Sequence, residues 1–257
     1  MTTAWCDLFA IKRRAIGAVW TGALAILLLS GCATGPGANP RDPLEPLNRT
    51  ISDFNDVVDK AFLKPVATAY TEVTPAPVRT GVSNFFSNLG DVWSFVNNVL
   101  QLKAQAAAET WMRLNVNTFF GLGGILDVAA EMNIERHKED FGQTLGRWGV
   151  PAGPYLVLPI LGPSTLRDGL ALMVDRQGNL ITHVDPTSTR NGLYLLRAVD
   201  ARANLLRTGT VIDEAALDKY SFTRDAYLQL RRSEIYDGEP PESEPEKGPD
   251  PDKEGSR

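Results

Sequence analysis

Cysteine and histidine are scarce in this sequence. The 257 residues include two cysteines, Cys6 and Cys32, and two histidines, His137 and His183. Because both cysteines fall within the first 32 residues, the rest of the chain has no cysteine nucleophile, disulfide or cysteine-based zinc site. Neither histidine belongs to an HExxH motif or to a ligand pair at helical spacing. We therefore predict that both histidines occupy surface or capping positions and that the protein binds no metal or other cofactor.

Motifs for catalysis and nucleotide binding are also absent. The sequence contains no GxSxG, Walker A or GxGxxG motif, and the run Gly121-Leu122-Gly123-Gly124 has neither the spacing nor the preceding strand of a phosphate-binding loop. These absences predict that the protein is not an enzyme. A Ser-His-Asp site stays an open alternative, since such triads assemble in space rather than in sequence.

An excess of positive charge is missing from the main part of the chain. Most of the formal charge of −5 at pH 7 belongs to the last 21 residues, which hold eight acidic and three basic side chains. Residues 32–236 hold 22 acidic and 20 basic side chains, so we expect no nucleic-acid partner. Fifteen of those basic residues are arginines, which suit phosphate recognition but are also what a GC-rich genome encodes.

The N-terminus has the pattern of a secretory signal. Lys12-Arg13-Arg14 precedes fifteen uncharged residues, 15–29, which are too few to cross a bilayer as a helix. The sequence Leu29-Ser30-Gly31-Cys32 resembles the bacterial lipobox. The resemblance implies a signal peptide at 1–31 and lipidation of Cys32, with a short transmembrane anchor as the alternative. Alanine rather than aspartate after the cysteine implies the outer membrane as the destination.

Proline divides the rest of the chain. Residues 32–47 are rich in proline and glycine and predict an extended, lipidated tether. Residues 48–236 include a long proline-free stretch, 81–150, in which helix-favouring residues are common. Residues 237–257 combine five prolines with acidic side chains and predict a disordered tail. We therefore predict one helical domain at 48–236 between the tether and the tail.

The spacing of apolar residues predicts a series of amphipathic helices. A first helix begins within 48–52 and is interrupted at Pro65, and a second begins after Pro77 and ends at Leu100. Further helices are expected at 103–119, 125–132, 141–148, 165–174 with Ser164 as its N-cap, 187–207 and 223–235. Gly121, Gly123 and Gly124 are expected to form either a hinge or a tight turn.

Two apolar features leave alternatives open. Residues 148–166 carry no charge, but four prolines and three glycines exclude a membrane-spanning helix, which leaves a buried irregular segment or a hydrophobic loop at a bilayer interface. Several aromatic residues of the second and third helices form either core or a membrane-facing side. These aromatic residues are Phe85, Phe86, Trp93, Trp111, Phe119 and Phe120.

Many separated motifs occur in the order that is typical of one family. They are Asp42-Pro43-Leu44-Glu45, Asn48-Arg49, Phe54-Asn55, Pro65, Asn84-Phe85, Asn117-Thr118, Gly121, Gly123-Gly124, Asp127, Phe141-Gly142-Gln143-Thr144-Leu145-Gly146, Gly153-Pro154-Tyr155, Leu158-Pro159, Gly162-Pro163-Ser164, Leu166-Arg167-Asp168 and Arg224-Asp225-Ala226-Tyr227. Over residues 42–232 the chain resembles the MlaA (VacJ) family of phospholipid-transport lipoproteins.

The resemblance implies an all-α fold, a single ring-like domain of amphipathic helices around a central channel. It implies an outer-membrane lipoprotein that faces the periplasm and removes misplaced phospholipid from the outer leaflet. The lipid would pass to a periplasmic carrier similar to MlaC, and this removal would maintain the lipid asymmetry of the outer membrane. The protein would also associate with a trimeric porin. A passive lipoprotein scaffold that tethers a porin or envelope complex is the alternative, and a membrane-anchored hydrolase is a third.

Four polar residues within the matched motifs are candidates for the path of the lipid: Arg49, Asn55, Arg167 and Asp168. A lipid that leaves a bilayer must move a polar headgroup and apolar tails together, and a path with a polar wall and an open apolar side lowers that barrier. Structural capping and ion pairing are the alternative roles of the same four residues. Gly121, Gly123 and Gly124 would then be a gate if they form a hinge.

Overall fold

The computed structural model describes residues 42–206, 208 and 216–241. The predicted signal peptide, residues 32–41 of the tether with Cys32, and residues 242–257 of the tail lie outside the described residues. In chain order the elements are α2 (Glu45–Val58), η1 (Asp59–Leu63), α3 (Lys64–Val73), α4 (Ala76–Leu100), α5 (Ala104–Phe119), α6 (Val128–Glu131), α7 (Phe141–Arg147), β1 (Tyr155–Leu158), β2 (Gly162–Thr165), α8 (Leu166–Gly178), η2 (Leu180–His183), α9 (Thr187–Asn204) and α11 (Lys219–Ile235).

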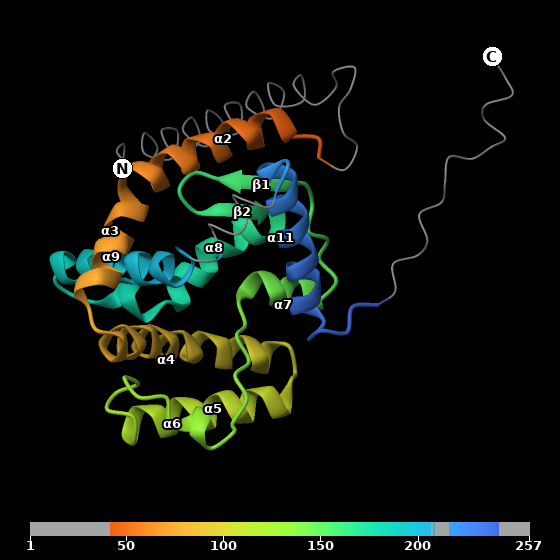
Figure 1. Ribbon diagram of the computed structural model, residues 1–257. Helices are drawn as coiled ribbons and strands as arrows, with labels where there is room; N and C mark the ends of the chain where they lie inside the picture. Colours follow the sequence, from red (N-terminus) through yellow and green to blue (C-terminus); the bar gives the residue numbers. More distant parts are fainter. Residues whose placement is uncertain (1–41, 207, 209–215, 242–257) are drawn as a thin grey trace, which may run out of the picture.

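Helices make up most of the domain. In Figure 1, α4 and α5 lie side by side at one end of the molecule, and α2 lies with the β1–β2 hairpin at the other end. Helices α3 and α9 lie along one side, α7 and α11 along the other, and α8 lies between them. The prediction of a mostly helical domain is confirmed. The all-α assignment is corrected by the hairpin, in which Tyr155 pairs with Thr165 and Leu158 with Gly162.

The first helix begins earlier than predicted and is not interrupted at Pro65. Helix α2 begins at Glu45, and a proline in its first turn costs no hydrogen bond. In the π-helical turn η1, the backbone N–H of Lys64 donates to the carbonyl of Asp59, and Pro65 then lies in the first turn of α3. The wider turn changes the hydrogen-bond register just before the proline, which needs no N–H there.

Helices α4 and α5 agree with the predicted ranges within one or two residues. The end of α4 is a Schellman motif, in which the N–H of Leu102 donates to the carbonyl of Val99 at 3.0 Å and the N–H of Lys103 donates to that of Asn98 at 3.0 Å. Leu102 therefore occupies the left-handed position, with φ of 59°. The short turn lets α5 return along α4.

The glycine cluster forms a tight turn between α5 and α6. A Cβ on Gly121 would lie 2.2 Å from the carbonyl oxygen of Leu126, and a Cβ on Gly124, whose φ is 92°, would lie 2.6 Å from Asn88. Both positions therefore require glycine. The predicted helix at 125–132 is too long, because only Val128–Glu131 is helical and Asp127 caps it by accepting a hydrogen bond from the N–H of Ala130.

The uncharged segment forms the hairpin rather than an irregular loop. Tyr155 and Val157 on β1 pack with Tyr220 of α11 in a small apolar cluster. The turn residues Ile160 and Leu161 are exposed, so the segment is buried at its strands and open at its tip. The expectation of an irregular backbone is therefore wrong for the strands, and contact of the tip with a bilayer stays a prediction.

The remaining helices differ from prediction mainly at their ends. Thr165 rather than Ser164 caps α8, because its side chain accepts the N–H of Asp168 and Ser164 belongs to β2. Helix α8 continues to Gly178 rather than ending at 174, α9 ends at Asn204 and α11 begins at Lys219 rather than at 223. Residue 207, the predicted end of the long amphipathic helix, lies outside the described residues.

Candidate functional site

The buried side chains of this domain are mostly polar. Among the described residues, 20 polar or charged residues are buried against 11 hydrophobic ones, and four of the latter are alanines. The largest fully buried side chains include those of Asn48, Asp91, Asn97 and Asn98. A water-soluble domain has an apolar interior in which buried polar groups are exceptions. The interior of this domain has the opposite character.

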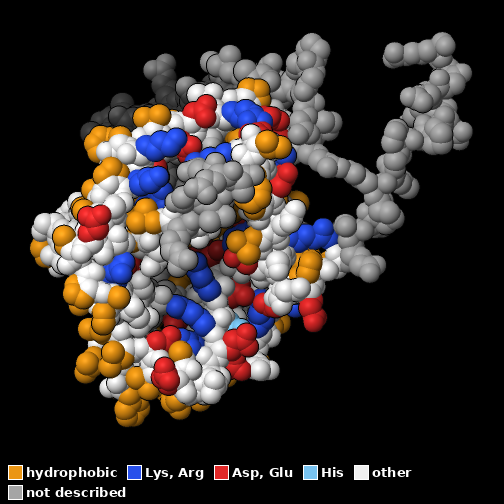
Figure 2. All heavy atoms as spheres, viewed as in Figure 1, with side chains coloured by type: hydrophobic (Ala, Val, Ile, Leu, Met, Phe, Trp, Pro, Cys, Tyr) orange, Lys and Arg blue, Asp and Glu red, His pale blue; other side chains and the backbone are white. Residues whose placement is uncertain are grey.

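The outer surface is correspondingly apolar. Within the described part of the chain, 34 large hydrophobic side chains are exposed. Some form a stripe along α2 and α3 that includes Leu47, Phe54, Val57, Phe62 and Val66. In Figure 2 hydrophobic side chains also gather on the margin where α5 and α6 meet. Apolar surface on this scale marks a contact with a membrane or another protein.

Helices α4 and α5 illustrate how the sequence produces this inversion. The buried polar residues of α4 recur every three or four positions, at Asn88, Asp91, Ser94 and Asn98. The side chain of Asn88 donates to Thr118 Oγ1 at 3.1 Å, and that of Asn98 donates to Thr110 Oγ1 at 3.5 Å. The polar stripe therefore faces the neighbouring helix, and the apolar residues of α5, such as Trp111, face outward.

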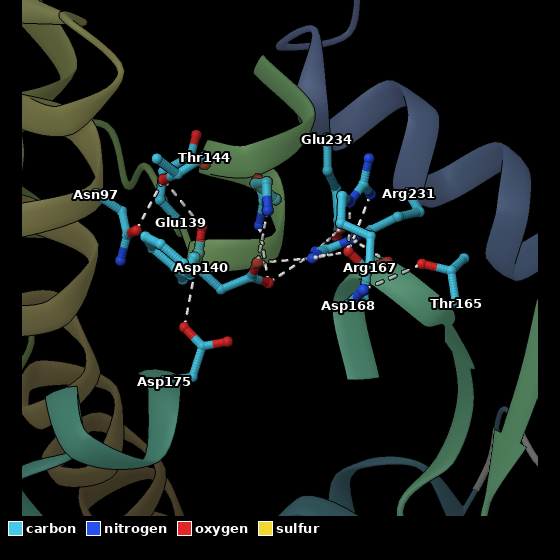
Figure 3. A network of polar contacts seen from close by, with 12 residues as sticks. Asn97, Glu139, Asp140, Thr144, Thr165, Arg167, Asp168, Asp175, Arg231 and Glu234 are labelled. Carbon is cyan, nitrogen blue, oxygen red and sulfur yellow. Dashed lines mark hydrogen bonds and ion pairs between the residues drawn. The ribbon is translucent and has the colours of Figure 1, made fainter. Parts of the chain in front are cut away.

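A buried ion-pair cluster joins α7, α8 and α11, and Figure 3 shows most of its members. Arg231 Nη2 donates to Asp140 Oδ1 at 2.6 Å, and its Nε donates to Asp168 Oδ2 at 3.2 Å. Arg167 Nη2 lies 2.9 Å from Asp168 Oδ1, and the hydroxyl of Tyr227 donates to Asp168 Oδ2 at 3.1 Å. One guanidinium thus bridges two carboxylates from different elements.

The charges within this cluster stabilise one another. Burial acts to raise the pKa of Asp168, but the hydrogen bonds and charge of Arg231 outweigh it and hold that pKa below its usual range. The pKa of Asp140 is lowered by the same balance. A Cβ on Gly142 would lie 2.5 Å from Asp168 Oδ1 and 2.6 Å from Arg231 Nη2, so this glycine leaves room for the cluster.

A second polar network connects α4 with α7 and the segment before it, and Figure 3 shows Asn97, Thr144 and Glu139 from this network. Thr144 Oγ1 donates to Asn97 Oδ1 at 2.8 Å. Gln101 Nε2 donates to Glu139 Oε2 at 2.7 Å, and Lys103 Nζ donates to Glu139 Oε1 at 2.7 Å. Burial raises the pKa of Glu139 despite the lysine. This network holds the α4–α5 pair against the rest of the domain.

A third network closes the end of α5. Arg113 Nη2 donates to both carboxylate oxygens of Asp127, at 2.8 and 2.7 Å. The side chain of Asn117 donates to Asp127 Oδ1 at 2.9 Å and accepts the N–H of Ala129 at 2.9 Å. The polar residues of the glycine-containing motif therefore bind to each other across the tight turn.

Arg49 lies on α2 in an ion-paired position. Its Nη2 donates to Asp218 Oδ2 at 2.7 Å, its Nε donates to Glu45 Oε1 at 2.8 Å, and its guanidinium carbon lies 4.4 Å from the ring centre of Tyr220. The hydrogen bond from Arg49, followed by one from Ser221, holds the pKa of Asp218 well below its usual range. The Arg49 side chain is still 40% exposed.

Asn55, one helical turn and a half further along α2, binds the hairpin. Its Nδ2 donates to the carbonyl of Leu158 at 2.9 Å, and its Oδ1 accepts the N–H of Ile160 at 2.7 Å. Both ends of the amide are therefore used by one turn of the backbone. This contact fixes the conformation of the hairpin tip.

The four lipid-path candidates fall into two places. Arg167 and Asp168 lie together in the buried cluster, whereas Arg49 and Asn55 pair with other groups on the side of α2. Arg49, Arg167 and Asp168 therefore make ion pairs, which were one alternative interpretation, and Asn55 makes hydrogen bonds to the backbone of the hairpin. Their role in a lipid path stays a prediction.

The aromatic residues of α4 and α5 separate into two groups. Phe86 is buried, and Phe85 and Trp93 are half-buried. Trp111, Phe119 and Phe120 are exposed, so an assignment to core does not hold for them. No described helix combines the length and apolar character that crossing a membrane requires.

One group of described side chains has the composition of a metal site. The ligand atoms of Glu109, Glu135 and His137 lie within 4.8 Å of one another. His137 Nε2, however, lies 2.5 Å from Glu109 Oε2 and lowers the pKa of that carboxyl, while Glu135 is exposed. The geometry is that of a surface pair. The other histidine, His183, is exposed and bonds the carbonyl of Gln177.

Sequence reasoning missed Arg231 and Asp140, which form the centre of the ion-pair cluster. Asp140 stands directly before Phe141 at a helix start, where its carboxylate accepts the N–H of Gln143. That N-cap signal was visible in the sequence. Arg231 gave no such signal, because nothing local distinguishes it from the exposed Arg232 that follows it.

The domain is similar to known proteins over most of its length. The family model described as MlaA lipoprotein matches residues 40–234. The proteins of Shigella flexneri and Escherichia coli K12 named intermembrane phospholipid transport system lipoprotein MlaA are each 37% identical over 214 residues, covering 80% of this chain and 84% of theirs. The Haemophilus influenzae protein of the same name is 34% identical and covers 88% of this chain and 93% of its own.

A solved structure, reported under the subject "Structural basis for maintenance of bacterial outer membrane lipid asymmetry", also matches. The TM-score is 0.67 at 35% sequence identity, over 76% of this chain and 98% of that one. Fold, sequence and family model agree over the same region. The chain therefore belongs to the MlaA lipoprotein family.

Proposed function

We propose that this protein is an outer-membrane lipoprotein that removes misplaced phospholipid from the outer leaflet and passes it to a periplasmic carrier. One observation carries the proposal: the domain buries polar side chains and exposes 34 large hydrophobic ones. A domain of this kind is stable next to hydrocarbon rather than in water. Its relatives are named as lipoproteins of an intermembrane phospholipid transport system, and we therefore propose phospholipid as the transported molecule.

The proposed transport needs no covalent step. A phospholipid leaving a leaflet exposes its tails to water or its headgroup to hydrocarbon, and each exposure costs several kcal/mol or more. Helices with one polar and one apolar side lower both costs when they surround a path. We propose a ring-like arrangement of this domain around such a channel, and we assign no catalytic residue.

Cys32 provides the proposed anchor. Each buried CH₂ adds about 0.8 kcal/mol, so the three acyl chains of a bacterial lipoprotein hold the chain on a membrane effectively irreversibly. The domain then faces the periplasm from the inner leaflet of the outer membrane. A soluble carrier similar to MlaC and a trimeric porin are the proposed partners.

Of the lipid-path candidates, we retain Arg49 as the contact for a headgroup. Its side chain is 40% exposed and presents a guanidinium that suits phosphate. Arg167 and Asp168 are enclosed by their own ion pairs, and we assign them to stability. Close packing at Gly121 and Gly124 favours a fixed turn over a gate. A gating role for Gly121, Gly123 and Gly124 stays a prediction.

The decisive experiment measures phospholipid in the outer leaflet of a strain that lacks this protein. Accumulation of phospholipid, restored to normal by the intact chain and not by a Cys32→Ser variant, supports transport from a membrane anchor. A scaffold that tethers a porin or envelope complex predicts an unchanged leaflet. An unchanged leaflet in the deletion strain would therefore refute the proposal in favour of the scaffold.

A further inference from the structure

Three turns hold a large aliphatic residue in the left-handed region of the backbone. They are Leu102 between α4 and α5 with φ of 59°, Leu122 between α5 and α6 with φ of 54°, and Ile160 between β1 and β2 with φ of 67°. Glycine and asparagine enter this region readily, whereas a bulky side chain is disfavoured and a β-branched one is an outlier. Each of these residues therefore costs stability that a glycine would not.

Contacts within the chain do not offset this cost, because the three side chains are turned outward. Leu102 is 89% exposed, Leu122 70% and Ile160 69%. Their exposed neighbours are apolar too, with Phe119 and Phe120 before Leu122 and Leu161 after Ile160. In water, each turn would be better served by a small or polar residue.

Each turn is held firmly in its conformation. The Schellman hydrogen bonds at the end of α4 fix Leu102. The N–H of Gly123 donates to the carbonyl of Thr118 at 3.0 Å, which fixes the turn of Leu122. Asn55 binds the backbone on both sides of the Ile160 turn. Disfavoured conformations persist where the surroundings determine them, and they often serve function.

We propose that Leu102, Leu122 and Ile160 are insertion points that contact the acyl chains of a lipid leaflet and set the depth and tilt of the domain. The inference rests on the proposed function, because it requires the membrane-bound position that is proposed there. Buried hydrocarbon contact would offset the cost of the left-handed backbone. Each tip then acts as a wedge at the end of a rigid element.

The arrangement of the turns favours a bilayer over a protein as the occupant. In Figure 1 the α4–α5 turn, the α5–α6 turn and the hairpin tip lie in three separate parts of the molecule. A single protein partner or a second copy would have to surround the domain to cover all three, whereas a leaflet reaches them at once. Trp148, exposed beside the first turn, donates its indole N–H to the carbonyl of Leu100 at 3.1 Å, and tryptophan is typical of membrane interfaces.

Single-cysteine labelling tests the proposal, because Cys6 and Cys32 are the only cysteines of the chain. The full lipoprotein carrying Leu102→Cys, Leu122→Cys or Ile160→Cys is labelled with an environment-sensitive fluorophore, and unmodified protein reports any labelling of Cys32. It is then placed in vesicles of phosphatidylethanolamine and phosphatidylglycerol that carry a nitroxide in the acyl chains or on the headgroup. We expect a blue shift and greater loss of fluorescence with the acyl-chain nitroxide at all three positions.

Two further positions make the outcome interpretable. Asn133 is exposed and also left-handed, with φ of 54°, but polar, so a label at Asn133→Cys should not be quenched by the acyl-chain nitroxide. Val57→Cys on the apolar stripe of α2 reports whether the domain meets the membrane at all. Quenching at 57 without quenching at the three turns overturns this inference alone.

Other results are also decisive. Absence of quenching at 57 and at the turns overturns both the inference and the proposed membrane position. Shielding of the turn labels in protein without vesicles identifies a second copy as the occupant and overturns the inference, as does quenching at 133 equal to that at the turns.

Discussion

Arg231 is the residue that joins the two acids of the ion-pair cluster. Its guanidinium binds Asp140 and Asp168, which come from elements far apart in the sequence. A buried carboxylate without a partner is costly, and removal of one partner of a buried pair costs about 3 to 5 kcal/mol. The packing of α7, α8 and α11 against one another therefore depends strongly on the side chain of Arg231.

An Arg231→Ala variant tests this dependence. We expect its free energy of unfolding to fall by about 3 to 5 kcal/mol, because the buried Asp168 and the partly exposed Asp140 both lose their counter-charge. Arg232→Ala is the matched control, since the next residue is exposed and its Nη2 donates to the carbonyl of Pro241, so its effect should stay within about 0.5 kcal/mol. Denaturant unfolding in a mild detergent measures both, and equal effects would contradict the assignment.

The lowered pKa values of the same acids predict an acid-sensitive fold. Asp140 and Asp168 have folded pKa values below the unfolded value of about 3.9, so their stabilisation is fully present above that value. It is lost as the pH falls below about 4 and the native carboxylates begin to take up protons.

We therefore expect the stability of the wild-type protein to decrease from about pH 4 downward, and an Asp168→Asn variant to show a smaller slope over the same range. Melting temperatures measured across that range test the slope. An unchanged slope in the variant would mean that other carboxylates control the acid response.

At the level of elements, hydrophobic periodicity located the helices but did not reveal which side each one buries. The spacing of apolar residues predicts α4 and α5 almost to their ends, yet α4 buries Asn88, Asp91 and Asn98, and its two asparagines bond to threonines of α5. A repeat of 3.6 residues defines a polar and an apolar face and says nothing about the solvent that each face meets. The polar residues Asn88, Asp91 and Asn98, which recur at helical spacing in α4, were the sign of the inversion.

The misplaced boundaries have local causes. Pro65 does not interrupt the first helix because a single π-helical turn prepares for it, and no sequence pattern signals such a turn. The hairpin escaped detection because four prolines and three glycines in 148–166 read as irregular backbone, whereas Asn55 from a distant helix holds the turn.

The turn at Leu102 gives a prediction with opposite signs at neighbouring positions. Leu102→Gly should stabilise the fold by about 0.5 to 1 kcal/mol, because glycine removes the cost of a left-handed side chain but adds unfolded-state entropy. Leu100→Gly, in the last turn of α4, should destabilise it by roughly 0.5 to 1 kcal/mol. Thermal unfolding of the two variants in detergent distinguishes the signs, and a destabilised Leu102→Gly protein would show that the leucine packs within the fold.

On the scale of the whole molecule, the exposed apolar surface should control membrane association independently of the lipid anchor. In a Cys32→Ser background, Val57→Glu should reduce partition into phospholipid vesicles at least about tenfold, because moving a charge toward hydrocarbon costs more than 1.4 kcal/mol. Gln229→Glu, which introduces the same charge at an exposed polar position of α11, should have little effect. Equal partition of the two variants in a sedimentation assay would place the membrane contact elsewhere.

Resemblance to a family predicted more of the whole molecule than any pattern of composition did. The motifs around Gly142 and Arg167 meet in one buried cluster, so the resemblance identified residues of this cluster before their contacts were known. Their partner Arg231 and the lipid path itself depend on how distant elements come together. No local spacing encodes that arrangement.

The polar interior also determines how the protein responds to temperature. The heat capacity change of unfolding grows with the apolar area that becomes hydrated and shrinks with the polar area. A domain whose buried residues are mostly polar exposes little new apolar surface when it unfolds. Its free energy of unfolding should therefore vary with temperature along a broad, shallow curve, with cold denaturation far below the range in which bacteria grow.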